Sequence, residues 1–367
     1  MMNNKEKQSP IGVPNIGTRI APSEQQDKTT YTLAELLAME VTELPCLFAP
    51  IFLKSGIAVV VGGSDTGKSS LLRQMAMSVA TGRDFLGWKY QGEHHRAIYF
   101  SSEDDPTITA RVIKRYNRTM QLGDLAAQNL RFEFEVNPET IVERLAVMLK
   151  EQPADLVVID ALGDAFNGKN LNDNTDVRKF YAPFKALAKE ANCLIVFNHH
   201  SGKRTSAYVP DKDNSLGSQA IEAAPRLAIE LRQDPDDPEI KHICVVKANY
   251  LSSDYKTKSY AIRMDENLVF MQTGDRAEFA KLAKDKKIKK SANPKDISEE
   301  EHRELIRSMF AAGEVNQKRL TDRVAEKFGI STKSARDKFE PYYISQGWIK
   351  RESKGGRTNS VSYSCLI

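Results

Sequence analysis

One stretch decides the fold: Ile57-Ala58-Val59-Val60-Val61, followed by Gly62-Gly63-Ser64-Asp65-Thr66-Gly67-Lys68-Ser69-Ser70. The apolar run is typical of a buried strand, and the spacing Gly62-x4-Gly67-Lys68-Ser69 is that of a phosphate-binding loop. Residues 71–77 continue as a helix, so the loop has the flanking strand and helix that the motif requires. The glycines let backbone N–H groups face phosphates, Lys68 neutralises the β and γ phosphates, and Ser69 coordinates Mg²⁺. We therefore assign Gly62 to Ser70 to a nucleoside triphosphate; a glycine-rich turn without nucleotide is the alternative.

Further apolar runs extend this strand and helix into a complete domain. They are residues 97–100, 156–159, 194–197, 227–231 and 242–246, separated by stretches with helical periodicity. Continuous apolar strands joined by helices are typical of a buried, mostly parallel sheet. The predicted class is α/β.

Length and composition limit the possible classes of protein. The chain has 367 residues, of which 41% are apolar and 28% charged, which fits two folded units in an ordinary globular protein. No apolar run approaches the ~18 residues that span a bilayer, and the polar start does not look like a secretory signal. We expect a cytoplasmic protein that does not bind membranes.

The four cysteines are scattered along the chain, at Cys46, Cys193, Cys244 and Cys365. This spacing favours buried free thiols over a zinc site or a disulfide framework.

Composition also shifts along the chain. Residues 1–28 are polar and predict a disordered arm. Residues 29–276 hold the strand and helix pattern, and residues 277–295 form a Lys-rich linker. Residues 296–367 form a second, smaller domain. From Lys281 onward there are 20 Lys and Arg against 12 Asp and Glu, so the C-terminal part is basic.

A second acidic site is needed to hold the metal, and Asp160 supplies it. This residue directly follows the apolar run 156–159, at the carboxyl end of a predicted strand. In P-loop enzymes such an acid helps bind Mg²⁺, which makes Asp160 the Walker B candidate. A helix cap or a surface charge is the alternative.

Hydrolysis requires a group that polarises the attacking water. Ala161 occupies the position after Asp160, where many P-loop enzymes carry a Glu. Glu103 follows the preceding strand instead, a placement that resembles the RecA/DnaB superfamily, and this resemblance implies that Glu103 is the general base. A solvated loop acid beside Asp104 and Asp105 is the alternative.

Over about residues 45–270 the chain resembles the RecA/DnaB superfamily, and within it the plasmid RepA-type hexameric helicases. Ordered segments carry the comparison: the phosphate loop, residues 99–103, 159–163, 197–203, 217–226 and 247–250. The resemblance implies a RecA-like P-loop ATPase that binds ATP and Mg²⁺ and assembles as a homo-oligomer, with a hexamer favoured.

The resemblance also implies roles for single residues. A residue at the end of the fourth strand senses the γ phosphate, which gives this duty to His199 or His200. Arg226 and Lys247 match positions from which family members reach the nucleotide of a neighbouring subunit. Ordinary polar strand-end residues and surface ion pairs are the alternatives. The loops 163–177 and 201–218 match those that hold single-stranded DNA, where Lys169, Lys203 and Arg204 would follow the phosphates.

The C-terminal part has helix signals and a hairpin. Ser298, Asn316 and Ser331 are candidate caps for successive helices, and two short strands flank Lys354-Gly355-Gly356-Arg357. This pattern resembles a winged helix, an addition that RepA-type helicases usually lack. The predicted contacts to duplex DNA are Lys333, Arg336, Lys338, Lys354 and Arg357, with Lys350 and Arg351. Docking of a protein partner, or packing within the ring, is the alternative.

The sequence thus predicts an ATP-dependent DNA motor, a replicative helicase of a plasmid, phage or mobile element that moves on single-stranded DNA. One alternative is an ATP-switched DNA-binding regulator, or a loader of a helicase or primase, without unwinding activity. A further, weaker alternative is a signalling ATPase resembling KaiC, for which the basic C-terminal part has no obvious function.

Overall fold

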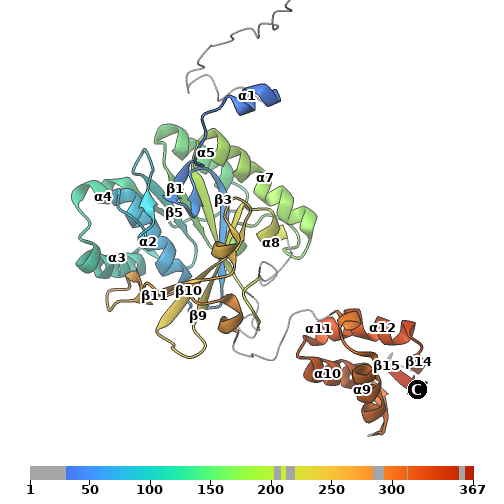
Figure 1. Ribbon diagram of the computed structural model, residues 1–367. Coiled ribbons are helices and arrows are strands. Elements are labelled where there is room, and N and C mark those ends of the chain that lie inside the picture. Colours follow the sequence, from blue (N-terminus) through green and yellow to red (C-terminus); the bar gives the residue numbers. More distant parts are fainter. Residues whose placement is uncertain (1–29, 202–207, 212–219, 284–292, 312, 355–359) are drawn as a thin grey trace, which may run out of the picture. The chain divides into compact units, whose positions relative to one another are not determined.

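The computed structural model describes residues 30–201, 208–211, 220–283, 293–311, 313–354 and 360–367 (Figure 1). The arm expected at residues 1–28 lies outside them. The chain divides into a unit that ends at Leu44 and a second unit from Pro45 to Ile367. In the first, α1 (Leu33–Leu37) begins at a capping box formed by Thr32 and Glu35. Among the described helices, none is both long and apolar enough to cross a bilayer.

A mostly parallel sheet forms the core of the second unit (Figure 1). Its strands lie in the order β12-β11-β10-β9-β3-β8-β7-β5-β6. The parallel strands are β3 (Gly56–Gly62), β5 (Ala97–Ser101), β6 (Leu130–Glu133), β7 (Leu156–Asp160), β8 (Leu194–His200) and β9 (Leu227–Gln233). The antiparallel strands are β10 (Ile240–Ala248), β11 (Tyr260–Met264) and β12 (Phe270–Gln272). Every apolar run singled out in the sequence is a strand of this sheet, which confirms the α/β class and agrees with the predicted RecA-like fold.

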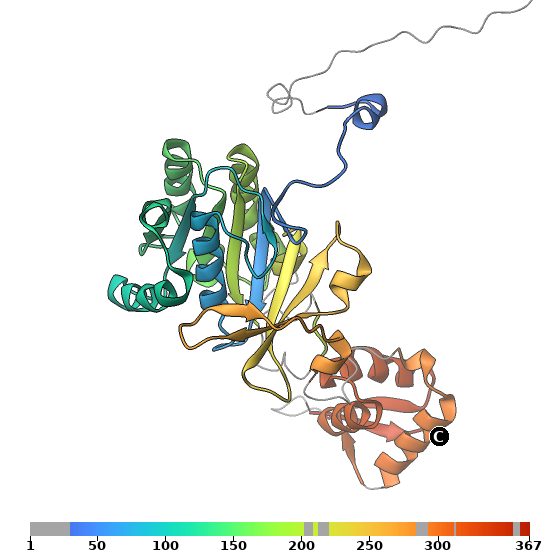
Figure 2. The same ribbon diagram turned by 60° about the vertical axis from the view of Figure 1, so that its left-hand side comes forward.

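Helices cover both faces of the sheet, as Figures 1 and 2 show. The helix after the phosphate loop, α2 (Lys68–Thr81), packs on the face that carries Val60, Tyr99 and Val158. The opposite face packs against the helices α5 (Ile141–Glu151) and α7 (Asn174–Glu190). The remaining helices of this part are α3 (Pro106–Met120), α4 (Asp124–Asn129), α6 (Leu162–Ala165), α8 (Ala220–Ala223) and η4 (Ser253–Lys256). Because side chains alternate along a buried strand, each strand contributes to both apolar layers.

A small antiparallel sheet is formed by residues from before and after the phosphate-loop strand. It consists of β1 (Cys46–Ala49), β2 (Phe52–Leu53) and β4 (Lys89–Tyr90). Phe48 and Phe52 are buried and pack against Phe85, which joins this sheet to the α2 side of the core.

One contact joins the beginning of the domain to its end. The Gln74 side chain on α2 donates to the Phe270 carbonyl at 2.8 Å and accepts from the Phe270 N–H at 2.7 Å. Both partners are buried, so β12 is held against the helix that follows the phosphate loop.

The start of the expected linker is packed against the sheet. Residues Phe279–Leu282 form η5, and Phe279 and Leu282 are buried against Cys244 on β10. Residues 284–292 lie outside the described part of the chain. Cys46, Cys193 and Cys244 are buried free thiols, as expected, and Cys365 is half-buried.

The C-terminal residues have an apolar core of their own, centred on Ile306, Phe339, Tyr343 and Trp348. The elements are η6 (Pro294–Asp296), α9 (Glu299–Ala311), β13 (Val315–Asn316), α10 (Gln317–Phe328), α11 (Thr332–Ser334), η7 (Ala335–Phe339), α12 (Glu340–Ser345), β14 (Ile349–Lys354) and β15 (Ser360–Cys365). The strands form an antiparallel sheet in the order β13-β15-β14.

The predicted helix caps of the C-terminal part are present. Asn316 and Ser331 accept backbone hydrogen bonds at the starts of α10 and α11, and α10 ends at Gly329. The helical run from residue 332 passes Pro341 and ends at Ser345, which is longer than the sequence suggested. Pro341 lies at the start of α12, directly after the π-helical turn η7, which interrupts the regular α-helical hydrogen bonds at this point.

Candidate active site

The phosphate loop bends sharply between β3 and α2. Gly67 has a φ of 91°, in the left-handed region that favours glycine. A Cβ atom on Gly62 would lie 2.5 Å from the Leu231 carbonyl oxygen on β9, so only glycine allows this close approach. Within the loop, the Lys68 Nζ and the Thr66 hydroxyl both donate to the Gly63 carbonyl at 2.9 Å. The loop is therefore shaped by its own contacts, and Lys68 is held at the position that the motif predicts.

Lys68 lies in a buried and acidic environment. Burial lowers the pKa of Lys68, whereas the charges of Asp160, Glu103 and Asp65 act in the opposite direction. These acids come from two strand ends and from the loop itself. The predicted catalytic lysine, the metal ligand and the general base therefore lie within electrostatic reach of one another.

Asp160 ends β7 and is held by two donors. The Tyr99 hydroxyl and the Asn198 Nδ2 both donate to its carboxylate. Burial raises the pKa of Tyr99 well above its ordinary value, so its hydroxyl stays protonated and serves as a donor. The Asn198 Nδ2 also lies 3.3 Å from the Ser69 Oγ, which joins the two predicted metal ligands through one amide.

This donor set fits a divalent cation. A serine hydroxyl and a carboxylate are the hard oxygen ligands that Mg²⁺ prefers when it also contacts nucleotide phosphates. The Asn198 Oδ1 is buried beside them and receives no hydrogen bond from any described residue. Among the described residues, none uses the bonding capacity of this one buried oxygen.

Glu103 follows β5 and faces His200, which ends β8. The His200 Nε2 lies 3.4 Å from the Glu103 Oε1, and the two side chains are 41% and 52% exposed. Both side chains are therefore accessible to a ligand bound at the carboxyl ends of the parallel strands. His199, the other sensor candidate, is buried. Since side chains alternate along a strand, His199 points to the α7 side of the sheet, away from Asn198 and His200.

Arg73 fixes the loop that carries Glu103. From α2 it forms an ion pair with Asp104, with side chains 6% and 28% exposed. Its guanidinium also lies 5.7 Å from the centre of the Tyr99 ring. The sequence assigned no role to Arg73, Tyr99 or Asn198, because their partners lie 31 to 129 residues away along the chain.

Arg226 and Lys247 lie at the opposite edge of the sheet from the phosphate loop. The Arg226 N–H donates to the Ile57 carbonyl at the start of β3, and Lys247 pairs with Ala228 at the start of β9. At about 3.3 Å per strand residue, Ile57 and Gly62 are about 16 Å apart. The strand register therefore separates both basic residues from the phosphate loop of their own chain.

The edge around Arg226 is positively charged. Burial lowers the pKa of Lys185 on α7, and the charges of Arg178 and Arg226 lower it further. Arg178, Lys185 and Arg226 are all exposed, so this edge can receive an anionic group from outside the domain.

The predicted DNA contacts are only partly described. Lys169, Lys333, Arg336 and Lys338 are exposed, and Arg336 forms an ion pair with its neighbour Asp337. Lys203, Arg204, Arg357 and the side chain of Lys354 lie outside the described part of the chain.

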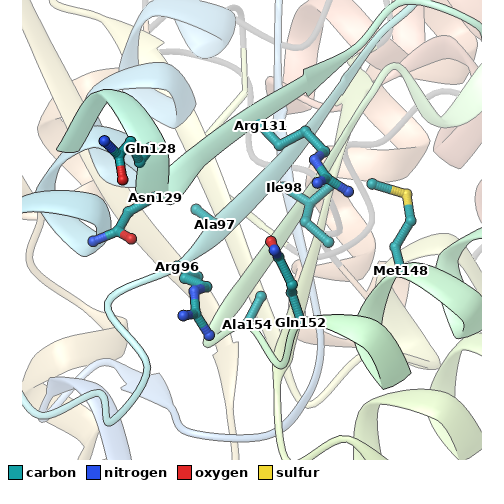
Figure 3. A pocket seen from close by; sticks show the side chains of 9 residues that line it. All are labelled: Arg96, Ala97, Ile98, Gln128, Asn129, Arg131, Met148, Gln152 and Ala154. Carbon is teal, nitrogen blue, oxygen red and sulfur yellow. The ribbon is translucent and has the colours of Figure 1, made fainter. Parts of the chain in front are cut away.

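A small cavity lies at the amino ends of β5, β6 and β7 (Figure 3). It is lined by Arg96, Ala97, Ile98, Gln128, Asn129, Arg131, Met148, Gln152 and Ala154. Because these strands are parallel to β3, the cavity is at the sheet edge opposite the phosphate loop and is separate from the nucleotide site.

The chain was compared with known structures, curated proteins and family models. A solved structure described as an ATPase domain aligns with 12% identity over 59% of this chain and 84% of that chain, with a TM-score of 0.45. A comparison with curated proteins found no match. A family model described as an AAA domain matches residues 22–206, which is half of the chain and includes the phosphate loop, Glu103 and Asp160. The chain therefore belongs to the AAA domain family and is a P-loop ATPase.

Proposed function

We propose that this protein is an ATP-dependent, oligomeric DNA motor, a replicative helicase of a plasmid, phage or mobile element that moves on single-stranded DNA. One observation carries the proposal. Glu103 after β5 and His200 at the end of β8, the two strands on either side of β7, meet at 3.4 Å, and the charges of Glu103 and Asp160 both act on Lys68. An acid that can polarise water is thereby paired with a residue that leads into the loop 201–218.

Each group has a part in hydrolysis. Lys68 leaves the Gly63 carbonyl to bind the β and γ phosphates, and Glu103 accepts a proton from the attacking water. Ser69 and Asp160 would hold Mg²⁺, which would supply positive charge to stabilise the transferring phosphate. His200 is favoured over His199 as the γ-phosphate sensor, because His200 contacts Glu103 while His199 is buried on the other face.

The proposal requires an oligomer, for which a hexamer is the favoured size. Arg226 and Lys247 lie too far from their own phosphate loop to act there, so they would serve the nucleotide of a neighbouring subunit. The positive charges of Arg178 and Lys185 favour the approach of that triphosphate.

DNA would be held by the loops that follow β7 and β8. Lys169, Lys203 and Arg204 would contact phosphates, which gives a salt-dependent affinity with little base preference. We propose that residues 296–367 form a winged helix, in which Lys333, Arg336 and Lys338 on one helical run, with Lys354 and Arg357 of the hairpin, bind duplex DNA.

ATP turnover with and without single-stranded DNA tests this proposal, together with displacement of a labelled strand from a forked duplex. DNA should stimulate turnover, and both activities should be lost in Lys68→Ala and Glu103→Gln. Asp105→Asn is the matched control, because it makes the same acid-to-amide change two residues away and keeps the oxygen that caps α3. Turnover that no nucleic acid changes would contradict the proposal.

One observation favours a second candidate, an ATP-switched DNA-binding regulator or loader without unwinding activity. The C-terminal residues have their own apolar core and expose Lys333, Arg336 and Lys338. In that case specific duplex binding would require residues 296–367, and no strand would be displaced.

A further inference from the structure

Asn198 directly follows the apolar part of β8, and its amide nitrogen contacts the predicted metal ligands. Its Nδ2 donates to the Asp160 Oδ1 and lies 3.3 Å from the Ser69 Oγ. A carboxylate accepts hydrogen bonds and cannot donate them, so the nitrogen of the amide must face Asp160. The orientation of the Asn198 amide is therefore fixed, with its nitrogen engaged by Asp160 and its oxygen left for another donor.

That oxygen has no partner within the described residues. The Asn198 side chain is only 2% exposed, and its Oδ1 receives no hydrogen bond. A buried amide oxygen without a donor is costly, and such atoms are usually satisfied by a water molecule, an ion or a ligand. Here the unsatisfied oxygen belongs to the same amide that contacts both Ser69 and Asp160.

We propose that Asn198 is a positioning residue of the metal site. Its nitrogen fixes the Asp160 carboxylate relative to the Ser69 hydroxyl. Its oxygen accepts a hydrogen bond from a water molecule of the Mg²⁺ that accompanies ATP. Mg²⁺ keeps several of its water molecules when it binds to proteins with nucleotide phosphates, so a donor is available at this position. The inference rests on the nucleotide site of the proposed function and is independent of movement along DNA.

The test measures binding instead of turnover. The affinity of the full chain for a fluorescent, non-hydrolysable ATP analogue is titrated over a range of Mg²⁺ concentrations and in EDTA. Mn²⁺ affinity in the presence of the same analogue is followed by electron paramagnetic resonance. The variant is Asn198→Leu, which keeps the branched shape of the side chain and removes both polar atoms. A thermal melt verifies folding, and Asn198→Ala replaces it if the leucine variant does not fold.

Thr109→Val is the matched control. The Thr109 hydroxyl is also buried without a partner among the described residues, but it lies on α3 and outside the metal site. The valine variant removes an unsatisfied oxygen of the same kind and should bind metal and nucleotide as the unchanged protein does.

We expect Asn198→Leu to weaken metal affinity about 10- to 100-fold, as is typical when a residue that orients metal ligands is lost. Nucleotide affinity in EDTA should stay unchanged, and high Mg²⁺ should restore the affinity of the variant. Equal losses with and without metal would assign Asn198 a purely structural role and overturn the proposal. Unchanged metal affinity would also overturn it. If DNA does not stimulate turnover in the unchanged protein, the motor proposal is refuted. The binding result for Asn198 would still stand.

Discussion

Arg73 on the helix after the phosphate loop forms an ion pair with Asp104, the residue that follows Glu103. The helix that carries Lys68 and the loop that carries the proposed general base are thus joined by a mostly buried contact. The position of Glu103 relative to α2 therefore depends on this ion pair.

The ion pair between Arg73 and Asp104 should contribute separately to the stability of the fold and to the rate of ATP turnover. Asp104→Leu leaves the Arg73 charge buried without its partner, which should lower the free energy of unfolding by about 1–3 kcal/mol. The double variant Arg73→Met/Asp104→Leu replaces the pair with apolar groups and should regain most of this stability. Its kcat should still fall by about 100-fold, because Glu103 is no longer held in place. Denaturant unfolding and steady-state ATPase rates measure the two effects, and a double variant with normal kcat would refute the positioning role.

The two glycines at the start of the phosphate loop should respond differently to alanine. In Gly62→Ala the new Cβ would meet the Leu231 carbonyl at 2.5 Å, and backbone cannot easily move aside. We expect a loss of about 1–3 kcal/mol in the free energy of unfolding and weaker ATP binding. In Gly63→Ala the nearest atom is the Thr66 Cγ2 at 3.6 Å, so stability should change by less than about 0.5 kcal/mol. Equal effects of the two substitutions in thermal melts would contradict this packing argument.

The C-terminal part should lose stability in mild acid because of His302. Its Nε2 lies 2.9 Å from the Pro294 carbonyl, so Nε2 carries the proton, and its Nδ1 accepts from the Tyr343 hydroxyl at 2.9 Å. Burial lowers the pKa of His302 below its ordinary value of 6.5. The unfolded chain therefore binds a proton more readily than the folded chain. The stabilisation is present above pH 6.5 and is lost as the pH falls from 6.5 toward the lowered pKa.

Trp348 reports on this transition, since its ring lies 5.9 Å from the His302 ring. Unfolding is followed by its fluorescence in a Trp88→Phe background, over a series of pH values. His302→Gln is the control, because it has no group that titrates in this range. If the free energy of unfolding depends on pH in the same way with and without His302, then His302 is not the origin of the loss of stability in acid.

Mixed oligomers should reveal whether Arg226 acts between subunits. Lys68→Ala and Arg226→Ala should each be inactive alone, since one lacks the phosphate ligand and the other the neighbouring cation. Mixing them should restore part of the ATPase activity, because some interfaces then combine an intact phosphate loop with an intact Arg226. A mixture of Lys68→Ala with Glu103→Gln is the comparison: both lesions lie in the same half of the site, so it should stay inactive. No recovery in the first mixture would argue against action across the interface.

Most of the sheet could be predicted because its strands are buried on both faces. The runs at 57–61 and 156–159 are continuous and apolar, and Asp160 stands out as the first acid after such a run. The small sheet around Phe48 and Phe52 escaped prediction, because strands of two to four residues have too little pattern to be recognised. The start of the expected linker looked polar, yet Phe279 and Leu282 pack against Cys244.

The predicted site was incomplete for a different reason. Contacts such as Asn198 to Asp160 depend on the register between β7 and β8, where Ile159 lies opposite Phe197. A single sequence does not reveal that register. Side chains alternate along any strand, and once the face of β8 that meets Asp160 is known, this alternation separates His200 from His199.

The reciprocal contact between Gln74 and Phe270 spans 196 residues of sequence. Contacts this distant require a long loop to close before they form, and they slow folding. During synthesis the helix after the phosphate loop leaves the ribosome long before β12 is made. The nucleotide-binding half must therefore wait for the end of the domain, and a fragment that stops before residue 270 should remain exposed to proteases and chaperones.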